Sequence, residues 1–145
     1  MGIVLDIARR AKSRAPMEVI SQCAISVEAG VERDSRGLSR KRQVTILAQS
    51  DWQAATGELG RPDLPWTIRR ANFLVADIVL PRISGTKLAL GSAILEVTGQ
   101  TDPCDRMDEQ VPGLKAALTP DWRGGITCRV IRAGTVKIGD SLTLL

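Results

Sequence analysis

The stretch Gly91-Ser92-Ala93-Ile94-Leu95-Glu96-Val97-Thr98-Gly99 decides the fold. Apolar and other side chains alternate along it, which is typical of a β-strand with one buried face. The alternation begins before this stretch, so the sequence predicts one long strand over 87–98. We expect a kink at Gly91, because a glycine within a strand often marks a bulge or a barrel corner.

Similar short strands are predicted on both sides of this stretch. They cover 3–7, 17–29, 43–48, two pieces within 68–80, 125–130 and 135–145. Helices are expected over 50–59, with Ser50 as the N-cap, and over 112–118. Many short strands with frequent glycine turns indicate a mainly β protein. We therefore expect a closed or partly closed antiparallel β-barrel with a few short helices, forming a single domain over 1–145.

The composition limits the chemistry available to the chain. Its 145 residues are 43% hydrophobic but only 3% aromatic, which predicts an aliphatic core. The net charge of +4 favours an anionic partner but does not by itself indicate nucleic acid. The chain contains no histidine, and so lacks the commonest general base and metal ligand.

The cysteine pattern argues for free thiols. The three cysteines are an odd number, are widely spaced and include no CxxC pair, which argues against a disulfide scaffold and a zinc ribbon. Asp6 interrupts the short apolar run at the N-terminus, and no stretch approaches the ~20 apolar residues that span a bilayer. We therefore expect no signal peptide, no membrane span and a cytoplasmic location.

Cys104 lies in the polar run 101–108, between the strand described above and a helix candidate. Asp102 is a candidate N-cap with Pro103 at the first helical position, which would place Cys104 in the first turn, near the positive end of the helix dipole. Arg106 adds positive charge nearby, whereas neighbouring aspartates oppose it. A thiol at such a junction is suited to chemistry.

Two interpretations of Cys104 follow. A thiolate there could accept a sulfur atom as a persulfide or bind a soft metal such as molybdenum. Alternatively, Cys104 is a small hydrophobic residue that covers one end of the barrel. Its polar neighbours favour the functional interpretation. Cys23 and Cys128 lie in alternating strand patterns, and we expect both to be buried.

Basic residues form two groups that suit oxyanion binding, because guanidinium groups bind phosphate oxygens in bidentate fashion. One is the run Arg33, Arg36, Arg40, Lys41 and Arg42; the other is Arg69-Arg70, just before Asn72. For Arg36, Arg40 and Lys41 we favour a solvated charged loop. Asn72 is either a site residue or a source of turn hydrogen bonds.

Two further segments keep two interpretations each. Asp34 either orders its loop or serves in the site. Arg123-Gly124-Gly125 is either a point where backbone N–H groups approach an anion or a plain turn. Trp52 and Trp66 are expected to be packing anchors.

Several elements, taken in their order and spacing, resemble a known family. They are Pro16-Met17, Gly30 to Asp34, Arg42 to Leu47, Trp66 to Phe73, Leu88 to Thr98 leading into Asp102-Pro103-Cys104, Trp122 to Gly125, and Gly134 to Asp140. Together they resemble the MOSC domain, the module found at the C-terminus of molybdenum cofactor sulfurases and as small stand-alone bacterial proteins. The resemblance covers nearly the whole chain.

The resemblance implies a β-barrel whose cysteine, here Cys104, transfers sulfur or ligates molybdenum. It favours Arg70 and Asn72 for binding the molybdenum cofactor (molybdopterin), and then Arg42, although a solvated loop for Arg70 and turn hydrogen bonds for Asn72 stay equally open. Asp34, Arg123 and Gly124, considered above for their own chemistry, are further candidates. Many members have a Gly-Asp-x-His pattern where this chain has Arg33-Asp34-Ser35-Arg36, so that histidine is absent. The family also implies a partner cysteine desulfurase that carries pyridoxal phosphate, which we do not expect on this chain.

Three functions follow as hypotheses. The first is a protein that carries sulfur on Cys104 or ligates molybdenum through it. The second is a molybdenum-dependent reductase of N-hydroxylated compounds, which would need a redox partner because no flavin site or iron–sulfur cysteine set is visible. The third is a non-catalytic anion-binding barrel. Scarce aromatic residues argue against nucleic acid as the anion, since single strands are usually gripped by stacking.

Overall fold

The alternating segment after Gly91 forms β8 (Ala93–Gln100), whose side chains at Ala93, Leu95 and Val97 are buried. β8 pairs antiparallel with β7 (Lys87–Leu90) on one side and with β9 (Ile126–Arg132) on the other. The single long strand predicted over 87–98 is wrong. The antiparallel pairing of β7 with β8 makes this segment a hairpin with Gly91 in its turn. The turn requires glycine, because Gly91 has a φ of 55° and a Cβ there would clash with the Thr135 carbonyl oxygen.

The computed structural model describes residues 1–145. The remaining strands are β1 (Gly2–Arg9), β2 (Glu18–Ile20), β3 (Gln22–Ser26), β4 (Gly30–Val31), β5 (Val44–Ala48), β6 (Phe73–Ala76), β10 (Gly134–Lys137) and β11 (Ser141–Leu144). The helices are α1 (Gln49–Glu58), α2 (Asp105–Gln110) and α3 (Leu114–Leu118), with 3-10 turns η1 (Trp66–Arg69) and η2 (Pro120–Trp122).

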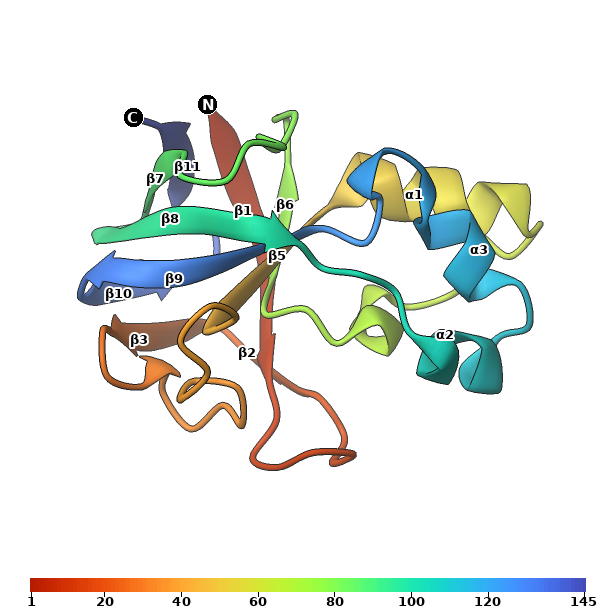
Figure 1. The fold of residues 1–145 in the computed structure, drawn as a ribbon, viewed down its shortest axis with the longest axis horizontal. Coiled ribbons are helices and arrows are strands. Elements are labelled where there is room, and N and C mark those ends of the chain that lie inside the picture. Colours follow the sequence, from red (N-terminus) through yellow and green to blue (C-terminus); the bar gives the residue numbers. More distant parts are fainter.

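Seven strands close into a barrel, which confirms the predicted fold class (Figure 1). Their order is β11-β7-β8-β9-β5-β6-β1, and pairing of β1 with β11 closes the ring. β5 and β6 form a parallel pair, whereas every other pairing is antiparallel. The chain between them includes α1, and parallel neighbours need such a crossover. β10, β3 and β4 form a small second sheet.

Three other predicted elements differ from the structure. The strand expected over 17–29 breaks at Ser21, because β2 pairs with β1 whereas β3 pairs with β10 in the second sheet. Of the two pieces expected within 68–80, only β6 forms, after the 3-10 turn η1. Helix α1 begins at Gln49 directly after β5, so Ala48 is its N-cap and Ser50 lies inside the helix.

Two apolar cores hold the fold together. Aliphatic side chains and Phe73 fill the barrel, while a second cluster packs the three helices against the outside of the barrel. In this cluster the Trp52 Nε1 donates to the Leu64 carbonyl at 3.1 Å, and the Trp66 Nε1 donates to Asp6 Oδ2 at 2.9 Å. Both tryptophans are therefore packing anchors, as predicted. None of the helices has the length and apolar character that crossing a bilayer requires.

Candidate functional site

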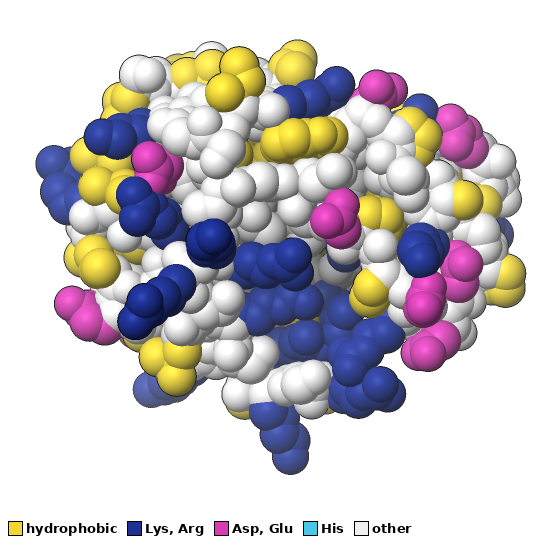
Figure 2. All heavy atoms as spheres, viewed as in Figure 1, with side chains coloured by type: hydrophobic (Ala, Val, Ile, Leu, Met, Phe, Trp, Pro, Cys, Tyr) yellow, Lys and Arg dark blue, Asp and Glu magenta, His cyan; other side chains and the backbone are white.

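A cavity of about 800 Å³ opens between the barrel and the helical side of the molecule. Four segments line it: the chain after β1, the loop between β4 and β5, the end of η1, and the link from β8 to α2. Its charged lining consists of seven cations, Arg10, Lys12, Arg36, Arg42, Arg69, Arg70 and Arg106, and two carboxylates, Asp34 and Asp102. Figure 2 shows Lys and Arg side chains gathered in one continuous area between the barrel and the helices.

Arg69 forms the floor of this cavity. Its Nε donates to the Gly124 carbonyl at 3.1 Å and its Nη2 donates to the Thr101 carbonyl at 2.6 Å. Burial and the positive charge of Arg36 lower the pKa of Arg69 to about 10. The guanidinium stays charged at neutral pH and ties the exit of β8 to the entry of β9.

Arg10 and Arg70 carry buried polar atoms without a partner. Arg10 is only 6% exposed, and neither its Nη1 nor the Nε of Arg70 has a hydrogen-bond partner. The buried hydroxyl of Thr101 is also unpartnered. Burial and the neighbouring Arg70 lower the pKa of Arg10 to about 10, and burial and Arg36 lower that of Arg70. Unpartnered buried polar atoms are rare in proteins, so these three mark hydrogen-bonding capacity that the fold itself does not use.

Asp34 orders its loop and also lies on the cavity lining. Its Oδ1 accepts from the Arg10 backbone N–H at 3.1 Å, and its Oδ2 accepts from the Arg36 backbone N–H at 3.3 Å. The same carboxylate lines the cavity and raises the pKa of Arg10, which partly opposes the effect of burial. Asp34 therefore fixes the loop and brings Arg36 to the site.

Cys104 is exposed and lies on the cavity lining. It precedes α2 as the N-cap residue, with φ −115° and ψ 174°, and the Met107 N–H donates to its carbonyl at 2.9 Å. The predicted N-cap at Asp102 and the first-turn position of Cys104 are therefore wrong, because the chain stays extended through Cys104. Its thiolate is close enough to Arg69 to oppose the burial that lowers the pKa of that guanidinium.

The other two thiols are buried, as predicted. Burial raises the pKa of Cys23 to about 11 and raises that of Cys128 further. A raised pKa suppresses the thiolate, the reactive form. Of the three cysteines, only Cys104 combines exposure with a cationic surrounding.

The structure does not bring Asn72 to the cavity lining. Asn72 is buried, its Oδ1 accepts from the Thr45 N–H at 3.0 Å, and its Nδ2 donates to the Ala8 carbonyl at 3.2 Å. The side chain thus joins β5 to β1. The sequence-based assignment of Asn72 as a cofactor contact is corrected to a structural role, because its amide is already satisfied within the barrel wall.

Arg123 and Gly124 also lie away from the lining. The Nη1 of Arg123 donates to Glu58 Oε1 at 2.8 Å and to the Ala117 carbonyl at 3.1 Å, so this guanidinium ties the helices together. Gly124 contributes only its carbonyl, which accepts from Arg69. Their candidacy as ligand contacts is corrected in the same way: both support the site from outside.

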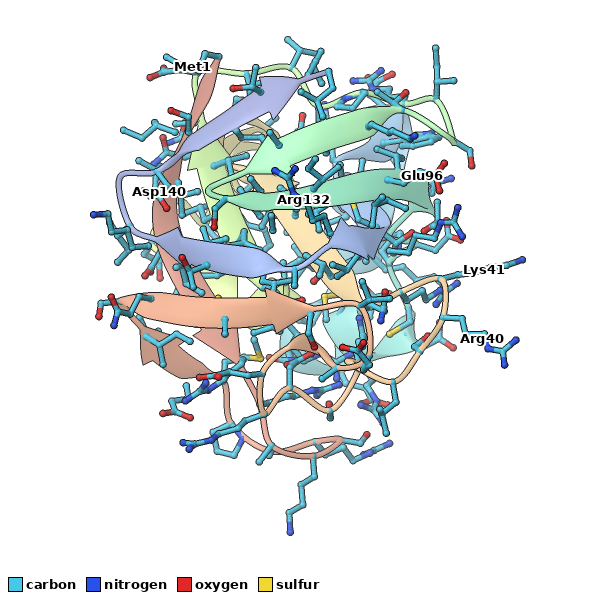
Figure 3. All side chains as sticks on the ribbon, turned by 90° about the vertical axis from the view of Figure 1, so that its left-hand side faces the viewer. Met1, Arg40, Lys41, Glu96, Arg132 and Asp140 are labelled. Atoms are coloured by element: carbon cyan, nitrogen blue, oxygen red, sulfur yellow. The ribbon has the colours of Figure 1, made fainter.

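Four arginines that line the cavity were not among the predicted site residues. They are Arg10, in a segment expected to be a loop, Arg36, in a run expected to be solvated, Arg69, beside the preferred Arg70, and Arg106, two residues after Cys104. The signal for Arg36 was Asp34, two residues before it, whose carboxylate accepts from the Arg36 backbone N–H. Arg40 and Lys41 are exposed and extend outward from the same loop, as predicted (Figure 3).

Comparisons with known proteins agree with this architecture. The family model described as MOSC domain matches residues 33–143. The YuaD protein from Bacillus subtilis is similar in structure, with a TM-score of 0.82 at 18% identity over 98% of this chain and 94% of that one. The YiiM protein from Geobacillus stearothermophilus gives 0.78 at 15% identity over 100% and 75%.

YiiM from Escherichia coli gives a TM-score of 0.76 at 15% identity, over 99% of this chain and 69% of that one. At such identities the likeness concerns the fold. A search of curated protein sequences finds no match. The family model covers most of the chain, including the cavity loop and Cys104, and the chain therefore belongs to the MOSC domain family.

Proposed function

We propose that this chain binds a molybdenum–pterin cofactor in the arginine-lined cavity and that Cys104 carries sulfur to this cofactor or ligates its molybdenum. The MOSC domain is associated with molybdenum cofactor proteins. One observation carries the proposal: the exposed thiol of Cys104 shares a cavity with guanidinium groups whose buried nitrogens, on Arg10 and Arg70, have no partner.

The cationic part of the cavity fits the phosphate of molybdopterin. Beyond the effect of burial, Arg70 and Arg36 lower the pKa of Arg10, and Arg36 lowers that of Arg70, so like charges repel one another here and a phosphate would relieve this repulsion. It would also accept from the unpartnered Arg10 Nη1 and Arg70 Nε. Charge and hydrogen bonding therefore favour the same ligand group.

The thiol part fits a soft metal. A thiolate is a preferred ligand for soft metal centres. No three His, Cys, Asp or Glu side chains are grouped so as to hold a metal ion by themselves, so Cys104 would be joined by sulfur ligands of the pterin. When bound, the cofactor supplies the redox-active metal. The chain itself would supply the cationic walls that hold the phosphate and the Cys104 thiol that faces the metal.

For sulfur carriage, the Cys104 thiolate attacks the terminal sulfur of a donor persulfide. A new S–S bond forms, and the donor cysteine leaves as a thiolate. A cysteine desulfurase partner with pyridoxal phosphate is the donor implied by the family, and the exposure of Cys104 permits such an approach. A reducing compartment such as the cytoplasm keeps this thiol free.

The test is to purify the protein from cells that make molybdopterin and to measure molybdenum and persulfide. Wild type is compared with Cys104→Ser, with Arg70→Gln, and with Arg132→Gln as a control at an exposed arginine on the barrel wall (Figure 3). Metal that is lost in Cys104→Ser supports ligation, and persulfide without metal supports carriage. Cys23 and Cys128 remain in the variant and act as internal controls.

Arg70→Gln should lose most of the bound pterin, whereas Arg132→Gln should retain it. If the wild-type protein carries neither molybdenum nor persulfide, the proposal fails, and this result supports the alternative of a non-catalytic anion-binding barrel. A molybdenum-dependent reductase would use the same cavity. Turnover of an N-hydroxylated compound by the loaded protein with a supplied electron donor would identify that alternative.

A further inference from the structure

Thr101 is the first residue after β8 and begins the link that leads through Cys104 to α2. It lines the cavity that contains Cys104, is 9% exposed, and has a buried hydroxyl without a hydrogen-bond partner. The proposed function assigns the other two unpartnered groups, on Arg10 and Arg70, to the phosphate of the cofactor. It leaves the Thr101 hydroxyl without a role.

The other buried threonines of the chain have satisfied hydroxyls. They are Thr45, Thr56 and Thr127, and each hydroxyl donates to an oxygen of the protein. Thr127 Oγ1, for example, donates to the Gly99 carbonyl at 3.3 Å. A buried hydroxyl without a partner lowers stability, because it has lost its hydrogen bonds to water. The one exception, Thr101, lies on a cavity, where a ligand can supply the missing partner.

The backbone of Thr101 is held from two sides. Its N–H donates to the Gly125 carbonyl at 2.8 Å, and its own carbonyl accepts from Arg69 Nη2 at 2.6 Å. Because its side chain is β-branched, it has few rotamers. The hydroxyl is therefore held in place before a ligand arrives, which reduces the entropy lost on binding.

The surroundings of this hydroxyl favour an anionic oxygen as its partner. Arg69, which bonds the Thr101 carbonyl, also lies within electrostatic reach of Cys104. A guanidinium offers only hydrogen-bond donors, whereas a threonine hydroxyl can turn its proton toward an acceptor. The charge of Arg69 attracts an anion, and the hydroxyl supplies a further donor to it. A negatively charged oxygen beside Cys104 matches both groups.

We infer that Thr101 is a further ligand-binding residue, whose hydroxyl donates to an anionic oxygen of the group bound beside Cys104. The inference rests on the proposed function and deepens it, because it adds a contact to the same cavity besides the phosphate contacts of Arg10 and Arg70. This contact selects ligands that present an oxygen at this point, since an apolar group there would leave the hydroxyl unpaired.

The variant Thr101→Val tests whether the hydroxyl serves the fold or a ligand. Valine keeps the β-branched shape and removes the unpaired hydroxyl, so the midpoint of thermal unfolding without ligand should rise by about 3 °C. The control Thr127→Val removes a hydroxyl that has a partner, and its midpoint should fall. A Thr101→Val protein with a lower midpoint than the wild type, or one that does not fold, would assign the hydroxyl to the fold and overturn the inference.

Calorimetric titration with inorganic molybdate tests the contact with an anion. Molybdate is the oxyanion of the proposed metal, and it can be added to protein from cells that make no molybdopterin. Thr101→Val should bind it about tenfold more weakly than the wild type, because a hydrogen bond to a charged group is lost. Thr101→Ser keeps the hydroxyl and should retain most of the affinity, and Thr127→Val should match the wild type. Equal affinities of Thr101→Val and the wild type, or no binding by the wild type, would overturn the inference.

The inference and the proposed function fail in different ways. If Thr101→Val loses molybdate affinity while the wild type from molybdopterin-making cells carries neither molybdenum nor persulfide, Thr101 remains an anion contact and the proposed function fails. If that wild type carries molybdenum while Thr101→Val binds molybdate as tightly as the wild type, the inference fails and the proposed function is retained.

Discussion

Cys128 and Cys104 are the same side chain in two opposite environments. Cys128 is 0% exposed on β9, among the aliphatic side chains of the barrel, where burial raises its pKa. Cys104 is exposed beside the guanidinium groups of the cavity. The comparison teaches that the barrel excludes water and charge to hold the fold, whereas the loops at its end gather the charge and the reactive thiol.

Asn72 and Arg70 are only two residues apart and show the same difference between a side chain of the scaffold and a side chain of the cavity. The Asn72 amide is satisfied by Thr45 and Ala8 in the barrel wall. Arg70, with a φ of 63°, turns out of η1 into the cavity and leaves its Nε without a partner. A satisfied polar group stabilises the scaffold, and an unsatisfied one is available to a ligand.

The largest expected effect is in thiol reactivity. In the native protein Cys104 should react with a maleimide at least ~10³-fold faster than Cys23 or Cys128, because the buried thiols require an opening of several kcal/mol. Labelling kinetics with mass spectrometry of the peptides measures this ratio. Reaction of Cys128 within tenfold of Cys104 would break the comparison.

The next effect is on stability. Phe73→Ala should lower the free energy of unfolding by about 4 kcal/mol, because Phe73 is fully buried in the barrel core. Cys104→Ser should change this free energy by less than ~0.5 kcal/mol, as is usual for an exposed position. Urea denaturation of both variants measures the contrast, and equal losses would contradict it.

Anions should stabilise the protein through the cavity alone. Phosphate at a hundredfold excess over its Kd should add about 2.7 kcal/mol to the free energy of unfolding relative to chloride at equal ionic strength. The gain should disappear in Arg70→Gln and persist in Arg132→Gln. Thermal melts of the wild type and of both variants measure this gain in stability. An equal gain in all three proteins would indicate a general salt effect and contradict the prediction.

The smallest expected effect is a fall in stability at mildly alkaline pH. Burial raises the pKa of Cys23 from 9.0 to about 11, so the folded state keeps a proton that the unfolded state releases above pH 9. Cys128 acts in the same direction. The free energy of unfolding should therefore fall by roughly 0.7 kcal/mol between pH 8 and pH 9. Urea titrations at both values check this, and Cys23→Val should show a smaller fall.

Local patterns predicted the barrel well and its turns less well. The alternation over 93–98 correctly predicted a strand, and the aliphatic composition predicted the core. Gly91 was expected to mark a kink within one strand, but it lies in a hairpin turn between two strands. The sequence does not distinguish these outcomes, because both place a glycine between two alternating segments. Ser21 likewise gave no local signal that the chain changes sheet there.

The site was predicted in part. Cys104, Arg70, Arg42 and Asp34 do line one cavity, whereas Asn72, Arg123 and Gly124 lie outside it. A conspicuous motif indicates that a residue matters but not whether it contacts a ligand or supports the wall. For Asn72 and Gly124 only the hydrogen bonds to distant backbone decide between the two.

The sequence by itself determined the family, the closed barrel, the burial of Cys23 and Cys128, and the exposure of a thiol at Cys104. The family follows from the order and spacing of motifs along the chain, whereas the other features depend on short-range periodicity and composition. Only the tertiary structure decided which arginines surround that thiol. Arg10, Arg36 and Arg70 come from three separate segments, and their convergence depends on chain closure and on the Asp34 loop contacts, which no local pattern encodes.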